Sequence, residues 1–373
     1  MIKSYGTVSF LFFFSICTLI NAQEMPRELG FEFGVMKPGS HNAITDVPGV
    51  MVGHVTLKEG TNIRTGVTAI LPHAGNMFQQ KVPAAVYVGN GFGKLAGSTQ
   101  IEELGNLESP IILTNTLSVA AGIEGVIDHT FSYPENDKVF SVNAVIGETN
   151  DGYLNDIRAR AVKASHVLEA IKNAAGGKVP QGNVGAGTGT VCFGFKGGIG
   201  TSSRKLPTEL GGYTVGVLVQ TNFGGVLQID GLPAGKLLEQ YTFKNQLESA
   251  DGSCMIIIAT DAPIGERNLK RLAQRGMLGL ARTGGIASNG SGDYVISFST
   301  DPDLRIPHQA NPLQLQNTKQ LRNDDMTALF LAAIEATEEA IINSLFAAED
   351  MEGRNANSIR ALPIEEIMKL KNK

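Results

Sequence analysis

The sequence predicts one large α/β (α+β) domain, with its strands gathered into two sheets and its helices outside them. Short runs rich in β-branched residues and amphipathic segments follow one another irregularly, not as regular β-α-β units. Hydrophobic residues make up 42% of the 373 residues, enough for a sizeable core, and no Pro/Ser/Gly linker is long enough to separate domains. The 44 glycines cluster between apolar runs, which predicts many tight turns.

Six apolar runs are predicted to be strands, because each is short and enriched in β-branched residues. They are residues 84–88, 110–114, 139–147, 215–221, 254–260 and 294–299. Several are apolar throughout, which indicates burial on both faces of a sheet.

Three amphipathic segments are predicted to be helices that pack on a sheet. The first runs from the capping pair Asn155-Asp156 to Gly176, and the second covers 266–285, ending at a glycine pair. The third covers 324–350 and begins with acidic residues, which the helix dipole favours at that end.

Residues 1–22 have the pattern of a secretory signal peptide, with one lysine, an apolar stretch and a small-residue end at Ala22. The alternative is a membrane anchor, but the apolar stretch of about 13 residues is shorter than the roughly 20 that span a bilayer. We therefore expect a periplasmic or secreted protein that has no membrane partner once the signal is removed. The net charge of −5 is spread without blocks of one sign, so no nucleic-acid partner is expected.

After removal of the signal, two cysteines remain, Cys192 and Cys254. We interpret both as small buried residues, and the sequence leaves open whether they form one bridge. Because side chains alternate along a strand, the Cys254 thiol should point away from the side chain of Ser253.

A glycine-rich stretch at 182–204 does not fit a nucleotide site. A P-loop ends in Gly-Lys-Ser/Thr, but Gly197 follows Lys196, and the dinucleotide fingerprint fails at Thr190. We interpret the stretch as a loop that brings the backbone close to another segment. The six histidines show no metal-ligand spacing and no G-x-S-x-G motif occurs, so neither a metal nor another cofactor is expected.

Gly252-Ser253 is a turn-prone pair placed directly before an apolar run, and the simplest interpretation is a turn that enters a strand. A second interpretation is chemical. A serine hydroxyl needs a base, and its own free α-amine can act as that base. A cut between Gly252 and Ser253 would create such an amine, whose reference pKa of about 7.7–8.0 suits neutral pH.

Separated motifs favour the chemical interpretation. They are NAITDVPGVMVGHVTL (42–57), ETNDGYLND (148–156), GAGTGTVCFGFKGGIGTSSR (185–204), VLVQTNFGG (217–225), DGSCMIIIATDAP (251–263) and LGLARTGGIASNGSGDYVISFST (278–300). In this order they resemble the DmpA/BapA family of self-processing β-aminopeptidases and D-aminopeptidases, from about residue 29 to 354. The resemblance implies a four-layer αββα sandwich, cut into an alpha chain of residues 23–252 and a beta chain of residues 253–373.

The resemblance also implies roles for individual residues. Ser253 would be the N-terminal nucleophile, and Ser291 and Asp293 would orient its amine and tune its proton affinity. Asn222 would supply an oxyanion contact, and Glu148 would receive the free amino group of the substrate. These groups suit an aminopeptidase, which must hold a terminal ammonium and position the scissile carbonyl.

The implied activity is release of an N-terminal β-, D- or L-amino acid from short peptides, amides or esters through an acyl-enzyme. The family also implies a homo-oligomer of alpha-beta heterodimers. Two alternatives stay open. One is an acyltransferase of the ornithine acetyltransferase type, against which Ser253 counts because the nucleophile there is usually threonine. The other is a non-catalytic periplasmic binding protein with the same sandwich.

Overall fold

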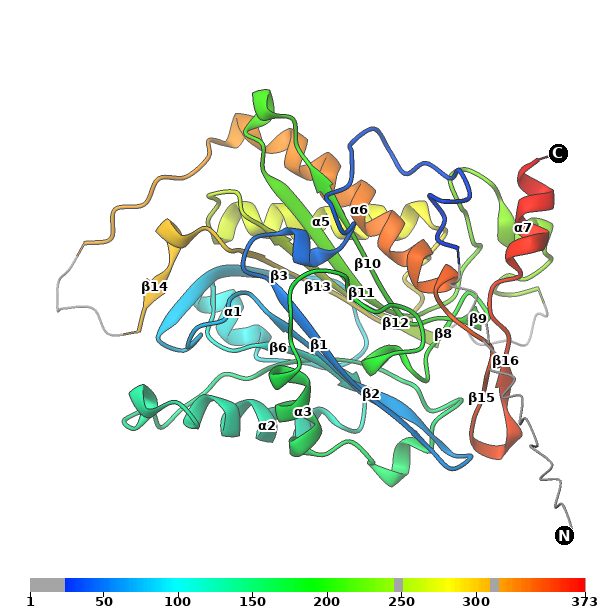
Figure 1. Cartoon of the computed structure of the whole chain (residues 1–373), viewed down its shortest axis with the longest axis horizontal. Helices are drawn as coiled ribbons and strands as arrows, with labels where there is room; N and C mark the ends of the chain where they lie inside the picture. Colours follow the sequence, from blue (N-terminus) through cyan, green and yellow to red (C-terminus); the bar gives the residue numbers. More distant parts are fainter. Residues whose placement is uncertain (1–23, 245–250, 309–314, 373) are drawn as a thin grey trace, which may run out of the picture.

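The computed structural model describes residues 24–244, 251–308 and 315–372, so the predicted signal peptide lies outside the described residues. Two sheets face each other, and each carries helices on its outer face (Figure 1). The resulting order of layers is helix, sheet, sheet, helix. The four-layer αββα sandwich implied by the sequence is confirmed.

The smaller sheet has five strands in the order β1-β2-β6-β7-β4. Their bounds are Met51–Glu59 (β1), Ile63–Leu71 (β2), Ile111–Asn115 (β6), Val145–Thr149 (β7) and Leu95–Ala96 (β4). Helix α3 (Ala164–Lys172) packs on β1 and β2, and helix α2 (Val119–Phe131) packs on β6 and β7. Strands β6 and β7 are parallel, so their carboxyl ends meet at one edge.

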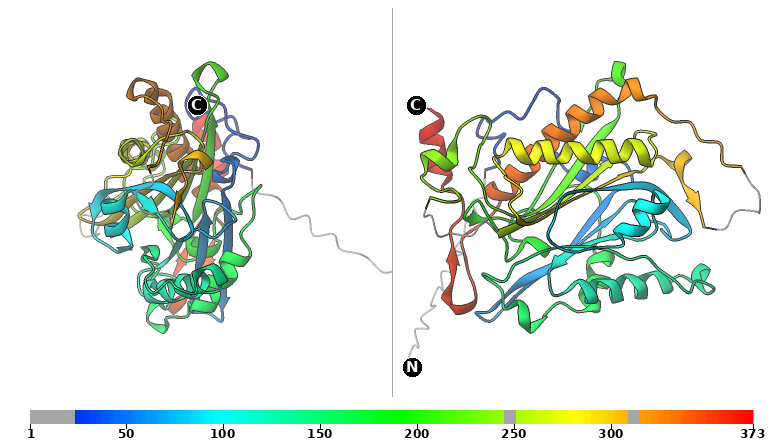
Figure 2. Two further views of the ribbon diagram at one scale, coloured as in Figure 1. Left: turned by 90° about the vertical axis from the view of Figure 1, so that its left-hand side faces the viewer. Right: turned by 180° about the vertical axis from the view of Figure 1, so that it is seen from behind.

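The larger sheet has seven strands, six of them in the order β10-β11-β12-β13-β3-β14, with β5 paired to β3. Their bounds are Ile199–Lys205 (β10), Thr214–Asn222 (β11), Asp251–Thr260 (β12), Gly290–Ser299 (β13), Gln80–Gly91 (β3), Ile306–Pro307 (β14) and Asn106–Leu107 (β5). Helices α5 (Glu266–Arg282) and α6 (Thr327–Phe346) cover its outer face, as the rear view in Figure 2 shows.

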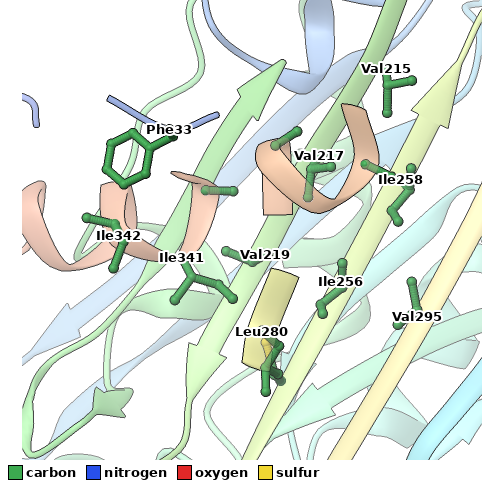
Figure 3. Close-up of a cluster of buried hydrophobic side chains, with 14 of the residues drawn as sticks. Phe33, Val215, Val217, Val219, Ile256, Ile258, Leu280, Val295, Ile341 and Ile342 are labelled. Carbon is green, nitrogen blue, oxygen red and sulfur yellow. The ribbon is translucent and has the colours of Figure 1, made fainter. Parts of the chain in front are cut away.

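Strand β12 contributes to two hydrophobic cores because its side chains alternate between faces. Met255 and Ile257 belong to the core between the two sheets. Ile256 and Ile258 belong to the core under α5 and α6, where they pack near Val217, Val219 and Ile341 (Figure 3). This double burial explains why the run 254–260 is apolar throughout, as a central strand requires.

Shorter elements complete the chain. They are α1 (Ser98–Leu104), α4 (Ala234–Leu237), α7 (Ile364–Lys371), the hairpin β8 (Val191–Cys192) and β9 (Phe195–Lys196), and the hairpin β15 (Met351–Glu352) and β16 (Ser358–Ile359). In the part of the chain that the structure describes, no helix is both long enough and apolar enough to span a bilayer.

Some predicted boundaries are wrong. The strand predicted at 139–147 begins at Val145, and the helix predicted from Asn155 begins only at Ala164, after a single 3₁₀ turn that ends at the left-handed residue Arg160. The glycine-rich stretch does bring backbones together, since Gly182 and Ile199 exchange hydrogen bonds of 2.7 and 3.0 Å. It also contains most of β10, which the sequence analysis did not predict.

Buried charges fasten α6 to the larger sheet. Arg204 on β10 is fully buried, and its guanidinium lies 3.2 Å from a carboxylate oxygen of Glu335 and 2.7 Å from one of Glu339. Arg27 in the N-terminal segment also pairs with Glu339, at 2.6 Å. Removing Arg204 would leave Glu335 buried without this cation and Glu339 with Arg27 alone, which is strongly destabilising.

We predict that Arg204→Ala lowers the free energy of unfolding by about 3–5 kcal/mol, because it leaves two buried carboxylates without their shared cation. Urea denaturation followed by circular dichroism measures the change. Arg322→Ala is the matched control, since Arg322 pairs with Asp324 on the surface with both side chains about 80% exposed and should change the midpoint little. Equal midpoints for the two variants would contradict the prediction.

Candidate active site

A cavity of about 710 Å³ lies where the ends of strands from both sheets meet. The larger sheet contributes Asn222 at the end of β11 and Ser253 near the start of β12. The smaller sheet contributes Glu148 from β7 and Thr116, which follows β6. The hairpin β8–β9 and the loop after β3 form other parts of the wall. The structure thus brings four of the predicted site residues to one cavity, namely Gly252 and Ser253 from β12, Asn222 from β11 and Glu148 from β7.

Ser253 is held on both sides by strand pairing. It lies opposite Asn222 on the antiparallel neighbour β11 and opposite Gly292 on the parallel neighbour β13. Its side chain is only 6% exposed, and its Oγ donates to the carbonyl oxygen of Gly252 at 2.6 Å. The Gly292 amide donates to the same Oγ at 3.4 Å. The hydroxyl therefore lies against the peptide unit that precedes it.

Gly252 lies within strand β12, so the interpretation of Gly252-Ser253 as a turn is wrong. The reason for glycine here is close approach, not bending. A Cβ atom at this position would lie 2.7 Å from the Cα of Phe223 and 3.0 Å from the carbonyl oxygen of Asn222. Only a residue without a side chain fits between these backbone atoms.

Ser291 and Asp293 lie in the neighbouring strand, on either side of Gly292, and both are 1% exposed. The Ser291 hydroxyl donates to Asp293 Oδ1 at 2.8 Å, whereas Asp293 Oδ2 is buried without a partner among the described residues. Burial raises the pKa of the Asp293 carboxyl to about 6, although hydrogen bonds from Ser291 and from the Cys254 backbone lower it. The pair lies next to Ser253 but away from the cavity, since neither side chain is among the described residues that line it.

Asn222 faces the cavity at the last position of β11. Its Oδ1 accepts a hydrogen bond from the Val191 amide at 3.0 Å. This contact fixes the orientation of the side-chain amide and leaves its NH₂ group as the donor available to the cavity. A fixed donor beside the Ser253 hydroxyl could stabilise an oxyanion if that hydroxyl attacked a carbonyl group.

Glu148 provides a buried carboxylate on the opposite wall, with only 3% of the residue exposed. One oxygen accepts the Lys94 amide at 3.0 Å, and the other accepts the Thr116 hydroxyl. The Lys94 ammonium lies 3.6 Å from Oε1. The carboxylate is thus held rigidly, with its charge facing the cavity.

The question left open about the cysteines is answered by the structure, because Cys192 and Cys254 are both free and buried. Burial raises the pKa of the Cys192 thiol to about 12 and that of the Cys254 thiol well above its ordinary value. Cys254 packs in the core under α5 and α6, so its thiol points away from the cavity, as predicted. Neither thiol is available as a nucleophile at neutral pH.

The sequence analysis missed several residues of the wall. Lys94, Thr116 and Tyr153 line the cavity, and the Tyr153 side chain is half exposed there. The run GNGFGK could have pointed to Lys94. It follows a predicted strand directly, and a glycine-rich loop at the end of a strand is a common place for functional residues. Nothing comparable marks Thr116. Within the described ranges, no group of three potential metal ligands comes together.

Lys196 explains how the glycine-rich stretch holds its shape. The side chain is fully buried, and its Nζ donates to the carbonyl oxygens of Gly187 and Gly197 at 3.0 and 2.7 Å. Burial lowers the pKa of this ammonium to about 7, and repulsion from Lys58 acts in the same direction. These bonds hold the hairpin that carries Val191, whose backbone amide donates a hydrogen bond to Asn222 Oδ1.

Comparison with known sequences places this geometry in context. The sequence profile of peptidase family S58 matches residues 42–359. The chain is 41% identical to the β-peptidyl aminopeptidase BapA of Sphingosinicella microcystinivorans, with 91% of this chain and 90% of the relative covered. It is 37% identical to the BapA of Sphingosinicella xenopeptidilytica, with 92% and 90% covered.

Solved structures agree with the sequence relatives. The β-aminopeptidase of a Burkholderia species superposes with a TM-score of 0.86 at 41% identity, with 94% of this chain and 98% of that chain covered. The L-aminopeptidase D-Ala-esterase/amidase of Ochrobactrum anthropi, described as a prototype of the serine aminopeptidases and a variant of the Ntn hydrolase fold, gives 0.85 at 36% identity, with 93% and 98% covered.

We predict that Asp293 makes the uncleaved chain less stable as pH rises. Because its pKa moves from 3.8 to about 6 on folding, the folded state binds more protons than the unfolded state between these values, and the free energy of unfolding falls across that window. The measurement is urea denaturation at pH 4 to 7 of Ser253→Ala, which removes the hydroxyl that the expected self-cleavage needs, and of Ser253→Ala/Asp293→Asn.

The stability difference between these two variants should shift by up to about 3 kcal/mol across the window, in favour of the asparagine variant at the higher pH. A difference in unfolding free energy that is the same at every pH has no bearing on the result. Only a change of this difference with pH reports the titration of Asp293. A difference that stays flat from pH 4 to 7 would show that Asp293 titrates normally.

Proposed function

Because this chain belongs to peptidase family S58 and is a serine aminopeptidase, we propose that it activates itself by cutting its own backbone between Gly252 and Ser253. The observation that carries this proposal is the contact of 2.6 Å between Ser253 Oγ and the carbonyl oxygen of Gly252. The hydroxyl is buried, and the peptide unit it touches is clamped between two neighbouring strands.

Self-cleavage proceeds in two steps, an acyl transfer from nitrogen to oxygen and a hydrolysis. Ser253 Oγ attacks the carbonyl carbon of Gly252, the amide C–N bond breaks, and an ester forms while the Ser253 nitrogen takes up a proton as a free amine. Water then hydrolyses the ester, which returns the Ser253 hydroxyl and leaves Gly252 as a carboxylate. Asp293 lies opposite Cys254 on the parallel neighbour β13, next to the residue whose nitrogen becomes this amine, and we assign it the role of orienting the new terminus.

Substrate turnover then repeats the same chemistry on an external carbonyl. Glu148 binds the terminal ammonium, which sets the scissile carbonyl beside Ser253. The Ser253 amine removes the hydroxyl proton, Oγ attacks, and the Asn222 NH₂ group donates to the developing oxyanion. The leaving amine departs with a proton, and water hydrolyses the acyl-enzyme.

The substrates proposed are short peptides, amides or esters with an N-terminal β-, D- or L-amino acid. Two relatives at 41% and 37% identity are β-peptidyl aminopeptidases by name, which favours β-amino acyl groups for this chain. The cavity of about 710 Å³ is of a size to admit a short peptide. Export to the periplasm or medium is proposed from residues 1–22, and a homo-oligomer of cleaved chains from the family resemblance.

We predict that denaturing electrophoresis resolves the wild-type protein into two chains, residues 23–252 and 253–373, and that Ser253→Ala stays in one piece. The smaller chain should begin Ser-Cys-Met-Ile on Edman sequencing. Ser253→Thr is the conservative control, because it keeps a hydroxyl at the same position and should still be cut. A single intact chain in an active wild-type preparation would falsify self-cleavage, and acetyl transfer to ornithine without amide hydrolysis would indicate the acyltransferase.

A second prediction concerns Asn222. Asn222→Ala should lower kcat for a β-alanyl amide by about 10²- to 10³-fold, the cost of removing one oxyanion donor. Rates are normalised to the fraction of chain that is cleaved. Asn222→Asp is the informative partner, because it keeps the oxygen that accepts from Val191 but removes the NH₂ group. If Asn222→Asp retains the wild-type kcat, Asn222 serves only to hold the hairpin.

A further inference from the structure

Two side chains of opposite charge lie together on the cavity wall, and the proposed catalysis uses only one of them. Glu148 is buried, whereas the Lys94 side chain is 58% exposed, and its ammonium lies 3.6 Å from Glu148 Oε1. Both residues line the cavity that holds Ser253. Among the described residues of that lining, they are the only ones whose side chains carry a formal charge at neutral pH.

The carboxylate does not depend on this ammonium for its hydrogen bonds. The Lys94 backbone amide and the Thr116 hydroxyl already bind one oxygen each. The Lys94 side chain, which is largely exposed, adds one long ion pair to Glu148. Such a pair is weak, so an arriving ligand can replace either partner.

A ligand that carries both charges on one carbon fits this pair best. Its ammonium would bind Glu148 and its carboxylate would bind Lys94, so that every charge in the site keeps a partner. A ligand with an ammonium alone must instead displace Lys94 and bring a second positive charge beside it. The pair therefore selects for a dipolar head group on the N-terminal residue.

The chemistry of β-amino acyl groups identifies such a residue. A β-aspartyl group is a β-alanyl group whose amine-bearing carbon also carries a carboxylate. The separation between its amine and the scissile carbonyl is that of any β-amino acyl substrate. It adds only the negative charge that Lys94 can bind.

We propose that this aminopeptidase hydrolyses β-aspartyl (isoaspartyl) peptides and amides, with Glu148 binding the α-ammonium and Lys94 the α-carboxylate of the N-terminal residue. This rests on the proposed function, since it requires the amine to bind at Glu148. The bond that breaks is the amide between the β-carbonyl carbon and the next nitrogen. The acyl group passes to Ser253 Oγ, and water releases it as free aspartate.

The test compares β-aspartyl and β-alanyl p-nitroanilides on the cleaved enzyme. The wild type should show a kcat/KM for the β-aspartyl substrate about tenfold above that for the β-alanyl substrate. Lys94→Gln should reverse the order, because KM rises for β-aspartyl, which loses its partner, and falls for β-alanyl, which loses a repelling charge. Lys94→Arg should keep the wild-type order.

Lys270→Gln is the matched control. It removes the same charge from an exposed ion pair, that with Glu102, and Lys270 is not among the residues that line the cavity. The ratio of the two kcat/KM values should stay at its wild-type value in this variant. Each enzyme is first shown by electrophoresis to be cleaved, so that a change in ratio is not a change in processing.

Three results would overturn the proposal. If the cleaved wild type hydrolyses the β-alanyl but not the β-aspartyl substrate, the dipolar preference is wrong and the proposed function stands. If Lys94→Gln and Lys270→Gln leave the same ratio, Lys94 does not bind the carboxylate. If neither substrate is hydrolysed, the proposed β-amino acyl preference fails together with this inference.

Discussion

The active site depends on the pairing of β12 at the centre of the larger sheet. Its backbone bonds to β11 on one side and to β13 on the other, and its side chains are buried on both faces. Ser253, the proposed nucleophile, lies near the start of this strand and so has little freedom to move. A cut directly before Ser253 would leave the ladder from Cys254 to Thr260 in place, so the new terminus would keep its position without any further ordering cost.

Two kinds of support surround this strand. Hydrophobic side chains fill the spaces between layers, and a small set of buried polar groups fixes the connections that packing alone would leave loose. Lys196 fastens the hairpin beneath Asn222, and Arg204 joins α6 to β10. Both cations are fully buried, and burial of a charge costs free energy unless its partners are well placed. We therefore interpret these cations as groups that fix the relative positions of the segments they join.

The sequence predicted the layers and the strand 254–260, and the structure places four of the residues proposed for the site, Gly252, Ser253, Asn222 and Glu148, around one cavity. The sequence did not predict the hairpin of β1 and β2 or helix α2, where the apolar pattern is weak or broken by glycine. It assigned the wrong reason to Gly252, because the need for glycine comes from Phe223, which is remote in sequence. It did not predict a role for Lys94, because the ion pair between Lys94 and Glu148 forms only when the fold brings the two residues together.

The separation between Glu148 and Ser253 depends on how the two sheets pack, because the two residues lie on strands of different sheets. Gly147 precedes Glu148 on β7, and Met255 follows Ser253 by two residues on β12. A Cβ atom on Gly147 would lie 2.8 Å from the Met255 sulfur, so the sheets are in direct contact beside the site. Glu148, the proposed ammonium site, and Ser253, the proposed nucleophile, are therefore held apart by a packed core, which resists changes on the scale of a methylene group. Because one methylene separates an α-amino from a β-amino acyl substrate, this contact gives the fold a means to distinguish them.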